Sequence, residues 1–144
     1  MILIDANLLL YAYDPRATRH EASRRWLETT VSGPDLVRVA WVTLWAFVRI
    51  STNPRVFERP LSTREAEDAV SSWLAQPQVG VLEPGERHWE ILSDLMRAGQ
   101  TTGALVMDAA LAALAIEHGA TLYTTDRDFA RFPKLKWVDP LDAK

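Results

Sequence analysis

The stretch "ALVMDAALAALAIEHGATLYTTDRDF" (residues 104–129) joins an apolar run to a short strand-like segment and two acidic residues. Its first part, 104–118, has the length and apolar content of a buried helix, and Gly119 suits the helix end because glycine readily adopts the left-handed conformation. "TLYTT" (121–125) then predicts a strand that leads into Asp126 and Asp128. A buried helix followed by a buried strand is typical of an α/β fold.

The rest of the chain alternates in the same way. Strands are predicted at 1–4, 36–40 and 79–82, with a short one at 136–138, and helices at 7–13, 19–31, 41–52, 62–76 and 89–99. Asn7 is the predicted cap of the first helix, and Ser62 with Glu65 forms a capping box for the fourth. The strands are too apolar to leave one face in water. We therefore expect one three-layer α/β/α domain over residues 1–144, with a parallel sheet of four to five strands.

Composition narrows the possible classes of protein. The chain has no cysteine, so a disulfide framework and a thiolate metal site are excluded and a cytoplasmic location is expected. The first residues resemble no signal peptide, and no apolar run approaches the ~18 residues of a membrane span. The net charge of -3 gives no overall indication of nucleic-acid binding.

Acidic residues follow the predicted strands. Asp5 ends the first strand, Asp126 and Asp128 follow the fourth, and Asp108 lies in the opening turns of the helix before it. If the first and fourth strands are neighbours, these carboxylates meet at one sheet edge, where α/β proteins place their sites. Two such charges ~4 Å apart repel by about 4 kcal/mol, so a cation is needed. Carboxylate oxygens suit Mg²⁺ or Mn²⁺, which can activate water for hydrolysis of a phosphodiester.

Each acid also has a purely structural interpretation. Asp5 could cap the turn that follows it, Asp108 could interact with the helix dipole, and Asp126 could shape the turn after its strand. Asp128 could be a solvated neighbour of Asp126. The convergence of three separate segments favours a shared metal site over these four independent explanations.

Three segments carry a resemblance to a known family: "LIDANLLLYA" (3–12), "VTLWAFVRISTNPRVF" (42–57) and "MDAALAALAIEHGATLYTTDRDFARFP" (107–133). Together they resemble PIN-domain ribonucleases of the VapC toxin type. The resemblance implies a Mg²⁺- or Mn²⁺-dependent endoribonuclease that cuts tRNA, rRNA or mRNA. It also implies a homodimer, and a VapB-type antitoxin through which the toxin contacts operator DNA.

The resemblance also implies roles for individual residues. Asp5, Asp108 and Asp126 would be catalytic and metal-binding, and Asp128 a further metal ligand. Supporting positions that would help to shape the site are Asn7 and Thr125.

One position departs from the family pattern. The family usually has a glutamate three residues before an arginine in the helix after strand two, but here Ala46 precedes Arg49. Glu117 lies nine residues after Asp108 and so faces the opposite side of its helix, which leaves Asp128 as the better replacement.

Two supporting residues on the same helix have alternative roles. Thr43 lies near the start of the helix, where its hydroxyl could reach the site or serve as a cap or core group. Arg49 could bind a substrate phosphate or form a structural ion pair. Because the glutamate is missing, the chain could also be a degenerate PIN domain that binds the antitoxin and joins the operator complex without nuclease activity.

The tryptophans are assigned mainly to the core. Trp26, Trp73 and Trp89 fall on apolar helical stripes, which favours burial. Trp41 and Trp45 could serve a dimer or antitoxin surface, although core positions are slightly favoured for both.

Overall fold

A computed structural model describes residues 1–142. Its centre is a sheet of five strands in the order β3-β2-β1-β4-β5, and every neighbouring pair is parallel. The strands are β1 (Ile2–Ile4), β2 (Val37–Ala40), β3 (Val79–Leu82), β4 (Thr121–Tyr123) and β5 (Trp137–Val138). The predicted α/β class with a parallel sheet is confirmed. So is the condition on which the site depends, because β1 pairs directly with β4.

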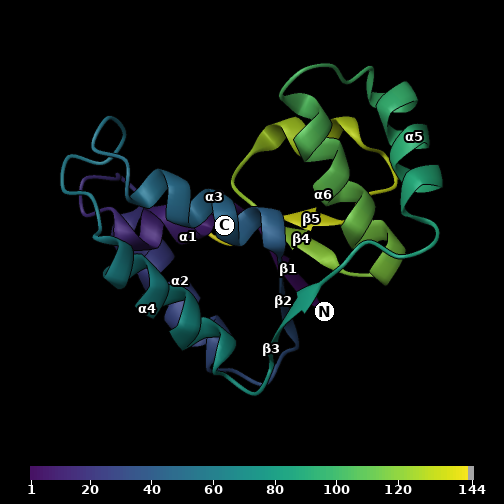
Figure 1. Ribbon diagram of the computed structural model, residues 1–144. Helices are drawn as coiled ribbons and strands as arrows, with labels where there is room; N and C mark the ends of the chain where they lie inside the picture. The colour runs from purple at the N-terminus through teal and green to yellow at the C-terminus, as the bar shows by residue number, and fades with distance from the viewer. Residues whose placement is uncertain (143–144) are drawn as a thin grey trace.

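Helices cover both faces of the sheet (Figure 1). The helices of the first half of the chain pack on one face: α1 (Ala6–Tyr13), α2 (His20–Val31), α3 (Trp41–Ser51) and α4 (Thr63–Leu74). On the other face lie α5 (His88–Gly99), α6 (Leu105–His118) and the short 3-10 helix η1 (Arg127–Arg131). None of the helices within residues 1–142 has both the length and the apolar character of a membrane span.

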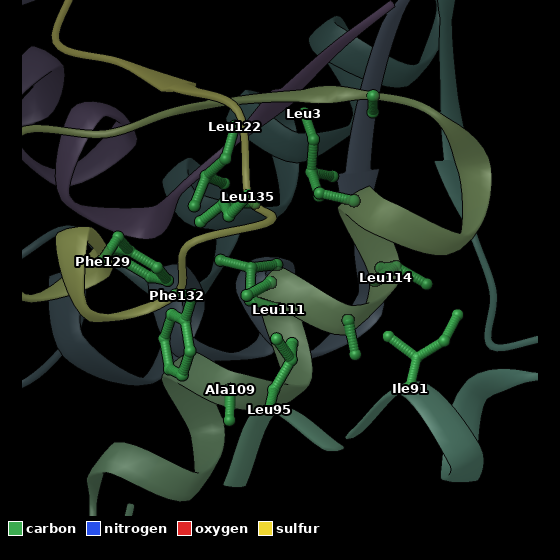
Figure 2. Packing of buried hydrophobic residues seen from close by; sticks show 14 of the residues in the cluster. Leu3, Ile91, Leu95, Ala109, Leu111, Leu114, Leu122, Phe129, Phe132 and Leu135 are labelled. Atoms are coloured by element: carbon green, nitrogen blue, oxygen red, sulfur yellow. The ribbon is translucent and has the colours of Figure 1, made fainter. Parts of the chain in front are cut away.

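The core under α6 fixes the acidic segment after β4. Figure 2 shows Leu122 of the sheet and Leu111 of α6 packed close to Phe129 and Phe132. Both phenylalanines are 1% exposed, so they anchor η1 and the chain just before it. Burial of two aromatic side chains contributes several kcal/mol, on the order of 1.5–3 kcal/mol each. The backbone that carries Asp126 and Asp128 is therefore held firmly against the core.

The core on the opposite face positions α1 and α3. Phe47 of α3 is buried and makes edge-to-face contacts with Tyr13 of α1 and Trp73 of α4, with ring centroids 5.4 Å and 4.8 Å apart. Such pairs are worth about 0.5–1.5 kcal/mol beyond the burial itself. This aromatic cluster locks the helices whose first turns approach the sheet edge.

Several local predictions need correction. Asp5, not Asn7, is the N-cap of α1, because its side chain accepts a hydrogen bond from the Ala6 amide. β4 stops at Tyr123, so Thr124 and Thr125, the last two residues of "TLYTT", lie beyond the strand. The capping box of α4, Ser62 with Glu65, is confirmed with both of its hydrogen bonds.

The assignment of tryptophans to the core was right for Trp26 and Trp73 and wrong for the other three discussed. Trp73 is buried and Trp26 stacks on Tyr123, as the apolar stripes predicted. The core assignment is wrong for the three tryptophans that remain exposed: Trp41 (42%), Trp45 (66%) and Trp89 (69%). Each lies within the first five residues of α3 or α5, on a side of the helix that is open to solvent.

Candidate metal centre

The sheet topology brings the four predicted acids to one edge. Asp5 ends β1, Asp108 lies in the first turn of α6, and Asp126 and Asp128 follow β4. A ligand oxygen from each of Asp108, Asp126 and Asp128 lies within 4.8 Å of the others. The convergence predicted from the sequence is therefore present, with these three acids at its centre.

Asp5 lies beside these three acids and is mostly buried. Its Oδ1 accepts from the Ala6 amide at 2.8 Å, and its Oδ2 accepts from the Thr124 hydroxyl at 2.7 Å. Burial raises the pKa of Asp5, the negative charge of Asp126 adds to that effect, and the two hydrogen bonds oppose it. The capping interpretation of Asp5 is thus confirmed. Asp5 is not one of the three acids whose oxygens converge, and its role in metal binding stays a prediction.

Thr124 connects the acids to one another. This residue is fully buried, and its hydroxyl donates to Asp5 while accepting from the Asp126 amide at 3.0 Å and from Nδ2 of Asn7 at 3.4 Å. The supporting role was predicted for Thr125, but these hydrogen bonds are made by its neighbour Thr124. Side-chain alternation contained the signal, because Thr124 shares the parity of the buried Leu122 whereas Thr125 does not.

The electrostatics of the cluster are those of a cation site. The pKa of Asp108 is raised to about 6, first by burial and then by the negative charges of Asp126, Asp5 and Asp128, while Arg131 acts in the opposite direction. A half-buried carboxyl that is so reluctant to ionise gains from any nearby positive charge. A proton or a metal ion at this position relieves the repulsion.

The donor set fits a hard divalent cation such as Mg²⁺ or Mn²⁺. The converging side chains offer carboxylate oxygens and no sulfur or imidazole ligand within the described part of the chain. Next to them, Oδ1 of Asn7 is buried and has no hydrogen-bond partner among residues 1–142. An unpaired acceptor beside acidic groups is costly unless a donor or an ion completes it.

The side of the site opposite β4 is neutral. Thr43 and Ala46 of α3 line a pocket of about 120 Å³ together with Asp5, Asp108 and Met107. Thr43 is buried and lines this pocket, a position that suits both of the roles considered for its hydroxyl. Ala46 lies where the family pattern would place a carboxylate, and it leaves that wall without charge.

Two further residues lie away from this wall. Arg49 is exposed one turn beyond Ala46 and forms no ion pair with any of residues 1–142, so the proposed structural pair is not found there. Glu117 accepts hydrogen bonds from the amides of Gly85 and Arg87 at 2.9 Å and 3.1 Å. It therefore holds the loop that leads into α5, and the prediction that it faces away from the acids is confirmed.

Comparison with known proteins agrees with this fold. A family model described as PIN domain matches residues 2–135. Ribonuclease VapC37 of Mycobacterium tuberculosis is 44% identical over 97% of this chain and 97% of its own length. Ribonuclease VapC33 of the same species is 41% identical over 98% of this chain and 99% of its own length. The chain belongs to the PIN-domain family, in its VapC ribonuclease group.

Solved structures give the same fold at lower identity. VapBC2 from Rickettsia felis, bound to a DNA fragment from its promoter, aligns with a TM-score of 0.66 at 18% identity. The alignment covers 96% of this chain and 98% of that one. The parallel sheet with helices on both faces is therefore shared with this group of structures.

Proposed function

We propose that this protein is a metal-dependent endoribonuclease toxin that hydrolyses phosphodiester bonds in single-stranded or loop regions of tRNA, rRNA or mRNA. The observation that carries this proposal is the convergence of Asp108, Asp126 and Asp128 beside the buried Asp5. The names of its relatives, ribonucleases that match nearly the whole chain, support the same activity.

The side chains divide the work in the following way. Asp108, Asp126 and Asp128 would hold Mg²⁺ or Mn²⁺, and Asp5 would complete the negative wall behind them. When bound, such an ion supplies charge that stabilises the phosphate during in-line attack and promotes deprotonation of the attacking water. Thr124 keeps Asp5 and the Asp126 backbone in fixed relation through its hydrogen bonds. No separate protein base is required by this arrangement.

The partners are those of a toxin–antitoxin pair. A VapB-type antitoxin would bind the chain, inhibit it in the cytoplasm and connect it to operator DNA, which the toxin itself would contact only indirectly. The VapBC2 complex bound to promoter DNA, which has the same fold, supports this proposal. We further propose a homodimer as the active assembly.

Ala46 favours one alternative function. Because α3 brings no carboxylate to the neutral wall, the chain would act as a degenerate PIN domain if three acids and Asp5 were too few to bind a metal. It would then bind the antitoxin and take part in the operator complex without cutting RNA. Metal titration separates the two functions, since a degenerate site binds Mg²⁺ and Mn²⁺ negligibly.

The decisive experiment is incubation of antitoxin-free protein with total cellular RNA in Mg²⁺, Mn²⁺ or EDTA, using the parent and Asp5→Asn. Asparagine keeps an oxygen that can cap α1, so the fold is retained while one charge is lost. Asp35→Asn, at an exposed position, is the matched control. We expect discrete fragments from the parent and the control that require metal, and none from Asp5→Asn. Equal cleavage by Asp5→Asn would refute the assignment.

A further inference from the structure

Positive charge concentrates at one end of this acidic protein. Residues 14–20, between α1 and α2, and residues 49–64, from late α3 into α4, together contain six arginines and two acidic residues, a net charge of +4. The rest of the chain, whose total is -3, therefore carries -7. The two segments lie side by side, because Arg16 forms an ion pair with Glu58 (Figure 1). We refer to them as the basic end.

Two packed helices connect the metal centre to the basic end. α1 starts at its cap, Asp5, and α3 starts beside the site with Thr43 and Ala46. At 1.5 Å per residue, the eight residues of α1 extend about 12 Å before the first basic segment begins. Residues 41–48 of α3 extend about the same distance before the second. Arg49 lies three residues after Ala46 and so continues the same face of α3 toward the basic end.

The loop between α3 and α4 is held in place by local hydrogen bonds and by one buried side chain. The side chain of Asn53 accepts from the Arg55 amide at 2.9 Å, and its carbonyl accepts from the amides of Val56 and Phe57 at 3.0 Å each. Phe57 is buried, with 3% exposed, which pins the loop to the core. Val56 is 58% exposed beside the exposed Arg55. Val56 and Arg55 are therefore both held in place and accessible from solvent.

The arginines of this loop are available for a ligand. Arg55 and Arg59 are exposed and form no ion pair with any of residues 1–142. By contrast, Arg24 on α2 is held by Glu21 and Glu28. Free guanidinium groups bind phosphates in a bidentate manner without first breaking an internal pair.

We propose that the basic end binds the part of the RNA strand that flanks the scissile phosphate, with Arg55 and Arg59 contacting backbone phosphates. Val56 packs against a base or ribose of the same strand. This inference rests on the proposed nuclease function and extends it, because it assigns the path of the substrate away from the metal centre along α1 and α3. Such contacts also offset the repulsion between an acidic protein and RNA.

The test compares two double variants that remove the same charge. Arg55→Gln/Arg59→Gln alters the basic end, and Arg24→Gln/Arg97→Gln removes two arginines that are paired elsewhere on the surface. Binding of a fluorescent 12-nucleotide single-stranded RNA to the full chain is measured by anisotropy in EDTA over a range of salt concentrations. Each lost phosphate contact should reduce the salt slope by about 0.7, so we expect the first variant to bind roughly tenfold more weakly with a slope lower by about 1.4.

The outcomes separate this inference from the proposed function. The Arg24/Arg97 control should match the parent in affinity, slope and thermal midpoint. If Arg55→Gln/Arg59→Gln binds RNA like the parent while the parent still cleaves RNA, the basic end is not a substrate surface, although the nuclease assignment stands. If Arg55→Gln/Arg59→Gln loses antitoxin binding while its RNA binding is unchanged, the inference is overturned. The basic end would then bind an acidic segment of the antitoxin. A parent that neither binds nor cleaves RNA would overturn both proposals.

Discussion

A single buried hydroxyl organises the acidic site. Thr124 donates to Oδ2 of Asp5 and accepts from the Asp126 amide, so it fixes two of the four acids that come from different strands. Neither acid can shift without breaking a hydrogen bond in a water-poor environment. The geometry of the site is therefore set as much by this neutral residue as by the carboxylates.

Replacing Thr124 with valine, which has a similar shape, tests this role. We expect the free energy of unfolding to fall by about 1–3 kcal/mol at neutral pH, because a buried carboxylate loses its donor. Mn²⁺ affinity should fall about 10–100-fold, as observed when groups that orient ligands are removed. Urea unfolding and Mn²⁺ titration by electron paramagnetic resonance measure the two effects. Thr124→Ser keeps the hydroxyl and should behave like the parent; a valine variant with parental Mn²⁺ affinity would contradict the role.

Asp108 gives the site a pH dependence with a definite sign. Its pKa is about 6 in the folded chain, against an ordinary value of 3.8. The folded chain thus holds this proton more tightly than the unfolded chain does. The contribution of Asp108 to stability is largest below pH ~4 and is lost as the pH rises toward ~6. After allowance for solvent screening of a half-buried group, the loss amounts to about 1–2 kcal/mol.

Asp108→Asn should therefore be more stable than the parent at pH 7.5 in the absence of metal, by that same amount. The difference in unfolding free energy between the two proteins should shrink as the pH falls from 6 to 4, which isolates Asp108 from other titrating groups. Urea denaturation at four pH values measures it. Saturating Mg²⁺ should stabilise the parent but not the variant. A difference independent of pH would show that Asp108 ionises normally.

At the scale of elements, the hydrophobic pattern was sufficient to predict the strands, their parallel direction and the acidic residues that follow them. Apolar runs such as "MILI" and "VGVL" can be buried only in a covered parallel sheet, and the βα alternation then orients every strand the same way. The meeting of Asp5 with Asp126 was predicted on the condition that the first and fourth strands are neighbours, and the pairing of β1 with β4 meets that condition. The capping box of Ser62 and Glu65 was also predicted correctly, because it depends only on residues three positions apart.

Patterning failed where the deciding contact was not local. Trp45 and Trp89 fit the apolar stripes of α3 and α5, yet both are exposed, because a stripe says which residues share a face and not whether another element covers it. The cap of α1 depended on whether Asp5 or Asn7 comes first at the turn. Each of these outcomes needs the three-dimensional position of a neighbouring strand or helix.

At the scale of the whole molecule, the exposed tryptophans of α3 indicate where a second copy would bind. Trp41 and Trp45 border a groove of about 510 Å³ whose other lining residues are mostly apolar, with Leu82 of β3 and Leu114 of α6 among them and Glu83 and His88 as the charged or polar members. Large aromatic side chains beside such a groove are costly in water and are typical anchors of interfaces. The groove adjoins the metal centre, since Val42 and Leu111 line both. Pairing through this surface would bring two acidic sites close together.

We therefore expect the parent to have twice the monomer mass in light scattering coupled to size exclusion, and Trp45→Glu to have the monomer mass. A buried negative charge at the centre of an apolar contact has no partner and opposes association. Trp89→Glu, at a similarly exposed tryptophan of α5 that does not line the groove, is the control and should remain dimeric. A dimeric Trp45→Glu protein would place the interface elsewhere. A monomeric parent at micromolar concentration would show that α3 keeps its tryptophans exposed for the antitoxin instead.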